Sequence, residues 1–143
     1  MLHKLAVWLG AVLFTYLLAA ALVSPFNMAE IEALGVPVST RSLLTAVGHD
    51  IWHMTGLYLP IIALALLIAF PVAALLAART ALHGWLLYPL AGFVALLAIH
   101  ASLYVVFGMS PIAATREWAG LLAQGLAGLA GGAFYALLHR RAA

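Results

Sequence analysis

The sequence contains no cysteine and very little charge, and both absences restrict what the protein can be. Without cysteine, disulfides, thiolate metal ligands, iron–sulfur clusters and thiol redox chemistry are excluded. Six Lys or Arg and four Asp or Glu among 143 residues are too few to form a nucleic-acid-binding surface. We therefore expect no nucleic acid among the partners of this chain.

Charge is almost absent from four long apolar runs that occupy most of the chain. The runs lie at about 5–23, 57–78, 86–107 and 117–138. Each is close to the roughly 20 residues that a helix needs to cross about 30 Å of hydrocarbon. Backbone groups inside lipid must be paired within the segment, so the runs are predicted to be helices. The sequence thus predicts an all-α, polytopic membrane protein: a four-transmembrane-helix bundle forming a single domain over residues 1–143.

Aromatic side chains mark where these runs meet the membrane surface. Indole prefers the headgroup region of a bilayer, and a tryptophan stands at or just before the start of each run. Tyrosines are expected at both surfaces, Tyr58 and Tyr104 at the outer one and Tyr88 and Tyr135 at the inner one. The tryptophans are Trp8, Trp52, Trp85 and Trp118.

The first run has an alternative interpretation as a secretory signal. Lys4, an apolar stretch and the small residues at 19–21 match the pattern of a signal with a small-residue cleavage site. The run is longer than the usual apolar core of about 7–15 residues. An uncleaved first helix is therefore the preferred prediction.

The basic residues predict the orientation of the bundle. One side of the predicted membrane carries four of them and the other side two, and the more basic side faces the cytoplasm. We therefore predict a multi-pass protein of the cell inner membrane with both the N and C termini cytoplasmic. The inner group is Lys4, Arg79, Arg140 and Arg141, and the outer group is Arg41 and Arg116.

The only long connector covers residues 24–56, on the predicted outer side. Pro25 is expected to end the first span. Further along, Ser39 and Thr40 provide a hydroxyl cap for a new helix start. Apolar residues over 43–54 recur at helical spacing, with polar residues on another face. This pattern predicts a short amphipathic helix in the first outer loop, at the membrane surface.

Small residues recur at four-residue steps in the second and fourth runs. Such rows let helix backbones approach closely, which is how helices associate in lipid. The rows predict contacts between helices of one bundle, or a surface for a homo-oligomer or a larger membrane complex. They comprise Ala65, Ala69, Ala73 and Ala77 in the second run and Ala119, Ala123, Ala127 and Gly131 in the fourth. In the fourth run Gly128 and Gly132 also form a GxxxG pair, and Gly120 and Gly125 are further small residues.

The histidines are the side chains best suited to chemistry. His49 and His53 are four residues apart and share a helix face, with Asp50 beside them. His100 lies within the third run, where an ionisable residue is a functional candidate. If these imidazoles converge at the outer face, they can bind a divalent metal, with Asp50 or Glu117 as a further oxygen ligand or an orienting group.

Two cofactors are compatible with these histidines. Copper is favoured because thioethers suit it, and three methionines are also expected on the outer side. Haem would use His100 and either His49 or His53 as axial ligands, although His100 is expected about 10 Å deeper by helix rise. A third interpretation needs no cofactor: His49 and His53 lie at headgroup level and His100 hydrogen-bonds a neighbouring helix. The methionines are Met28, Met54 and Met109.

The sequence contains no motif typical of an enzyme or a pump. No nucleophile is paired with a recognisable base, and no glycine-rich phosphate loop follows a strand. No Asp, Glu, Lys or Arg lies deep in a run, so a transport path would depend on a few neutral groups. The sequence favours a non-enzymatic accessory, assembly or structural component acting through helix–helix packing. The alternatives are a metal- or haem-binding protein and a small oligomeric transporter. The neutral groups are His100, Gln124, Thr15, Tyr16 and Ser102.

Overall fold

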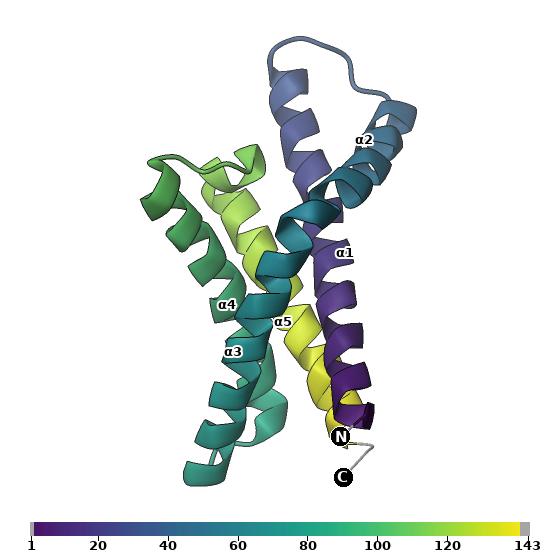
Figure 1. Cartoon of the computed structure of the whole chain (residues 1–143). Helices are drawn as coiled ribbons and strands as arrows, with labels where there is room; N and C mark the ends of the chain where they lie inside the picture. The colour runs from purple at the N-terminus through teal and green to yellow at the C-terminus, as the bar shows by residue number, and fades with distance from the viewer. Residues whose placement is uncertain (1, 141–143) are drawn as a thin grey trace.

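The computed structural model describes residues 2–140, and these residues form helices joined by short connections (Figure 1). Four helices are long and apolar enough to cross a membrane, which confirms the predicted all-α, four-span architecture. Arg141, one of the residues used to predict orientation, lies outside the described range. The helices are α1 (Leu2–Ala33), α2 (Thr40–His53), α3 (Tyr58–Arg79), α4 (Gly84–Phe107) and α5 (Trp118–Arg140), with short 3-10 helices η1 (Met54–Gly56) and η2 (Ala113–Arg116).

The bundle is organised around α5. This helix packs most extensively against α4 and also against α1, while α3 packs against α4 and, less extensively, α1. Both ends of the described chain and the α3–α4 connection lie at one end of the bundle, which we call the terminal end (Figure 1). The other end carries α2 and η2, and we call it the α2 end.

Helix α1 is longer than the sequence predicts. Pro25 was expected to end it, but the helix continues through Pro25 to Ala33. A proline inside a helix removes one backbone hydrogen bond, and neighbouring contacts must offset that loss. Here α2 packs along this part of α1, and Ser24, which precedes the proline, is buried and hydrogen-bonds Asp50 of α2. At 1.5 Å per residue, the helix is about 48 Å long and exceeds the hydrocarbon thickness.

Helix α2 begins where the hydroxyl residues predict. Ser39 is the N-cap: its hydroxyl accepts a hydrogen bond from the Ser42 backbone N–H, and the Ser42 hydroxyl accepts one from the Ser39 N–H. This reciprocal pair satisfies two backbone donors that a helix start leaves free. The helix has no fully buried residue, and it inclines beside the end of α1 before leading through η1 into α3 (Figure 1).

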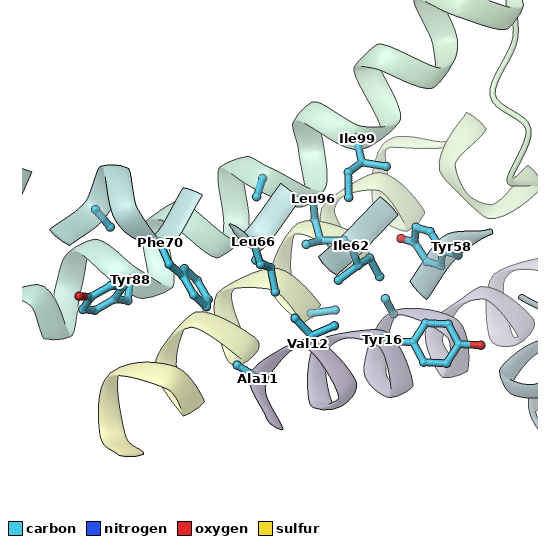
Figure 2. Packing of buried hydrophobic residues seen from close by; sticks show 14 of the residues in the cluster. Ala11, Val12, Tyr16, Tyr58, Ile62, Leu66, Phe70, Tyr88, Leu96 and Ile99 are labelled. Atoms are coloured by element: carbon cyan, nitrogen blue, oxygen red, sulfur yellow. The ribbon is translucent and has the colours of Figure 1, made fainter. Parts of the chain in front are cut away.

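The core is built on one stripe of α3. Tyr58, Ile62, Leu66 and Phe70 recur every four residues and are all buried, facing α1, α4 and α5 (Figure 2). Tyr58 was expected at the membrane surface but is only 3% exposed, because its hydroxyl has partners inside the bundle. The alanines at the proposed cleavage site of α1, Ala19 and Ala20, are also fully buried.

Candidate functional site

The glycines of α5 are used for contacts within the bundle. A methyl group added to Gly128 would overlap the Gly92 carbonyl oxygen of α4, and one added to Gly132 would overlap the Tyr88 carbonyl oxygen. A Cβ at Gly125 would lie 2.7 Å from the ring of Phe93. The backbones of α4 and α5 are therefore too close to admit a larger residue at Gly128 or Gly132. Such contact supplies the van der Waals packing that holds helices together in lipid.

Two further glycines, Gly120 and Gly92, also lie directly against a backbone carbonyl. The contact of Gly92 was not predicted from the sequence. Gly120 faces the Ala114 carbonyl of η2, which a methyl group would overlap. Gly92 is the partner of Gly128 on α4 and is not part of a four-residue row, because the residues four before and four after it are Tyr88 and Leu96. The pairing is visible only once α4 and α5 are placed side by side.

The alanine row of α3 has a different environment. Ala65, Ala69 and Ala73 lie beside the buried stripe and line an open groove between α3 and α4, with a volume of about 620 Å³. The α4 side of the groove supplies Ala91 and Ala95. Larger side chains form the rims and face outward. The rim residues are Leu64, Ile68, Val72, Leu90 and Val94.

A second feature is a buried chain of hydrogen bonds, which we call the polar relay. The Tyr58 hydroxyl donates to Gln124 Oε1 at 2.7 Å and lies 3.1 Å from His100 Nε2. Gln124 Nε2 in turn donates to the Ala19 carbonyl oxygen at 3.0 Å. His100, Gln124 and Tyr58 are each at most 4% exposed. The relay joins α3, α4, α5 and α1.

The direction of the hydrogen bonds in the relay determines which ring nitrogen of His100 carries the hydrogen. Because the single hydroxyl proton of Tyr58 goes to Gln124, His100 Nε2 must carry a hydrogen and donate to the Tyr58 oxygen. An Nε2 that donates a hydrogen bond has no lone pair for a metal. The interpretation in which His100 hydrogen-bonds a neighbouring helix is confirmed.

Other neutral groups proposed for a transport path are also engaged. Thr15 donates to the Ala11 carbonyl within α1, and the Tyr16 hydroxyl donates to the Ile51 carbonyl of α2. Of the five candidates, Ser102 is exposed and lines the α3–α4 groove. The hydrogen bonds of Thr15 and Tyr16 are those of side chains packed inside the bundle.

The remaining histidines lie at the α2 end. The rings of His49 and His53 are stacked with centroids 3.8 Å apart and planes inclined by 17°. His49 Nδ1 lies 3.6 Å from Asp50 Oδ1. Asp50 Oδ2 accepts a hydrogen bond of 2.5 Å from the hydroxyl of Ser24, which is buried in α1. Ser24 was not identified from the sequence, because nothing local indicates that α2 folds back onto it.

The structure stacks His49 against His53, with Asp50 3.6 Å from His49, and does not bring His100 to them. His100 is buried inside the bundle and hydrogen-bonds Tyr58, whereas His49 and His53 are exposed on α2. Between residues 2 and 140, no three His, Asp or Glu side chains are grouped to hold one metal ion. The three-histidine metal site and the bis-histidine haem site are therefore not assembled in this conformation.

The methionines expected beside these histidines are distributed over two clefts. Met28 lines a polar cleft between α1 and α2, together with His49 and Asp50. Met54 and Met109 line a smaller apolar pocket that His53 also borders. No protein-family model, curated protein sequence or solved structure matches this chain.

Proposed function

We propose that this small membrane protein is a non-enzymatic accessory or assembly component that binds a transmembrane helix of a larger partner in the α3–α4 groove. The observation that supports this function is the groove itself, which has an alanine floor on both helices. Exposed leucines in a membrane protein are ordinary, since lipid tails solvate them. A floor of alanines between bulky rims favours a helix backbone instead.

The length of the groove suits a membrane-crossing helix. Its α3 wall runs from Ile61 to Leu76, which is about 22 Å by helix rise. That distance covers most of a hydrocarbon core of about 30 Å. Ser102 is the one hydroxyl among the residues that line it. The partner segment is therefore apolar, with at most one interhelical hydrogen bond to this hydroxyl.

The shape of the groove favours a different protein over a second copy of this chain. A two-fold dimer would place the same surface against itself. Two concave grooves facing each other leave a void, whereas a single convex helix fills one. The glycines of α5, which would be the alternative contact surface, are already occupied by α4, α1 and η2.

Site-specific photo-crosslinking in native membranes tests this proposal. A photoreactive phenylalanine analogue replaces Ile68 or Val94 on the groove rims, and Leu13 or Leu17 on an exposed face of α1 serves as the control. We expect one protein adduct from the rim positions, with the crosslink mapping to an apolar membrane segment of another protein, and none from the α1 positions.

Filling the groove provides the matched test. Ala69→Leu should abolish the rim adduct, whereas Ala74→Leu should preserve it, because Ala74 is exposed on α3 outside the groove. Adducts to lipid alone, or to a second copy of this chain, would overturn the proposed function. An adduct that survives Ala69→Leu would place the contact elsewhere.

A further inference from the structure

His49 and His53 have the spacing along a helix that pairs of metal-ligating histidines often have. They are separated by one helical turn on α2, and their rings are in contact at 3.8 Å between centroids. Residues at this spacing lie on one face of a helix. The side chain of His49 is 62% exposed, so an ion can reach the pair from solvent. Two imidazoles one turn apart are a common basis for metal binding.

The contacts of the two Nδ1 atoms leave Nε2 free on each ring. His53 Nδ1 lies 2.9 Å from the His49 carbonyl oxygen, which can only accept, so this Nδ1 carries the hydrogen. In the neutral ring, the lone pair is then on Nε2. His49 Nδ1 faces the Asp50 carboxylate at 3.6 Å, which likewise favours a hydrogen on Nδ1. Among the residues that the structure describes, neither Nε2 has a hydrogen-bond partner.

His53 therefore has the orienting hydrogen bond typical of a ligating histidine, and His49 has a carboxylate near its Nδ1. Such a residue donates its second ring N–H to a carboxylate or a backbone carbonyl, which fixes the tautomer and the ring orientation. His53 Nδ1 donates to the His49 carbonyl of its own helix, whereas His49 Nδ1 lies 3.6 Å from Asp50 Oδ1, an electrostatic contact beyond hydrogen-bond distance. Asp50 is itself fixed by the buried Ser24 hydroxyl of α1, so the position of the carboxylate depends on the packing of α2 against α1.

We propose that His49 and His53 form a two-histidine binding site for a divalent transition metal, with Asp50 as a positioning residue. The two Nε2 atoms are the protein ligands once one ring has turned out of the stack, because the lone pairs of two nearly parallel rings do not converge on one ion. Water or a ligand of the ion completes the coordination. Imidazole suits copper, nickel and zinc, and the general order of affinity places Cu²⁺ first. The site does not involve His100 and is independent of the α3–α4 groove.

Copper titration of the full-length protein in detergent, purified without a polyhistidine tag, tests this inference. We expect one equivalent of Cu²⁺ to bind, with an electron paramagnetic resonance spectrum that shows nitrogen ligands. His49→Ala and His53→Ala should each weaken binding at least about tenfold and remove the two-nitrogen signature. His83→Ala is the matched control, since His83 is exposed at the terminal end, and it should bind like the wild type.

The role of Asp50 requires a separate measurement. Asp50→Asn should weaken Cu²⁺ binding by about 10- to 100-fold, as expected for loss of an orienting carboxylate, while the spectrum of the saturated protein keeps its nitrogen signature. All four variants change solvent-accessible positions, and unchanged circular dichroism verifies the fold. Undiminished copper binding in the His49→Ala/His53→Ala double variant would overturn the proposal. So would a wild-type protein that binds less than one equivalent.

Discussion

At the residue scale, the polar relay is a feature of the interior that would be energetically costly without its hydrogen bonds. Tyr58, His100 and Gln124 are polar groups inside an apolar bundle, and each would be destabilising there without a partner. Their hydrogen bonds satisfy one another and end on the Ala19 carbonyl oxygen. Because these partners come from four helices, the relay specifies which helices are neighbours and at what height they meet.

Tyr58→Phe should destabilise the protein. The substitution removes one hydroxyl and leaves both Gln124 Oε1 and His100 Nε2 buried without this partner. Hydrogen bonds between membrane helices contribute about 0.6 to 1.7 kcal/mol each, so we expect a loss of roughly 1–2 kcal/mol. Unfolding of the purified protein in mixed micelles measures the change. Tyr104→Phe is the control, because Tyr104 is exposed, and equal stability of the two variants would contradict the role of the relay.

Single residues also show how far the sequence could predict the site. Charge scarcity and run length predict the four spans, and the position of His100 inside a run marked it as unusual. The partner of His100 could not be predicted, because Tyr58 is 42 positions away and fits a membrane-surface tyrosine equally well. For the same reason, Ser24 was unremarkable in the sequence until α2 was found to pack against it.

At the element scale, the contact between α4 and α5 determines the shape of the bundle. Glycines on both helices remove the side chains that would hold the backbones apart, so Gly92 and Gly128 meet directly. Small-residue rows in the sequence predict that such a contact exists. They do not predict which row is used, and the alanine row of α3 in fact lines the open groove. The row that packs and the row that stays open have similar periodicity.

Gly92→Ala should separate α4 from α5. The new methyl group would overlap the Gly128 carbonyl oxygen, and backbone cannot move aside as a flexible side chain can. Overpacking of this kind destabilises proteins by about 1–3 kcal/mol, which the same micelle unfolding experiment detects.

Gly48→Ala in α2 is the matched control, and it should change stability in the opposite direction. A Cβ at Gly48 meets no atom within 4 Å, so only helix propensity acts, and alanine favours the helix by about 0.5–1 kcal/mol. If Gly92→Ala were as stable as Gly48→Ala, the close approach of α4 and α5 would be refuted.

At the scale of the whole molecule, the two ends of the bundle differ in charge. The terminal end carries Lys4, Arg79 and Arg140, while the α2 end carries all four acids of the chain and two arginines, Arg41 and Arg116. Basic residues near membrane spans are retained on the cytoplasmic side, so this difference favours an α2 end that faces outward. The proposed copper site would then receive its metal from outside the cytoplasm.

Single cysteines test this orientation without background, because the natural chain has none. Val36→Cys and Met109→Cys place a thiol in exposed connections at the α2 end, and Leu82→Cys places one at the terminal end. We expect a membrane-impermeant maleimide to label the first two in intact spheroplasts and to label Leu82→Cys only after permeabilisation. The reverse labelling pattern would show that the α2 end faces the cytoplasm. The proposed metal site would then receive its ion from the cytoplasm. Labelling of Val36 and Leu82 from the same side would contradict α3 as a membrane crossing, and the α3–α4 groove would then not lie in lipid.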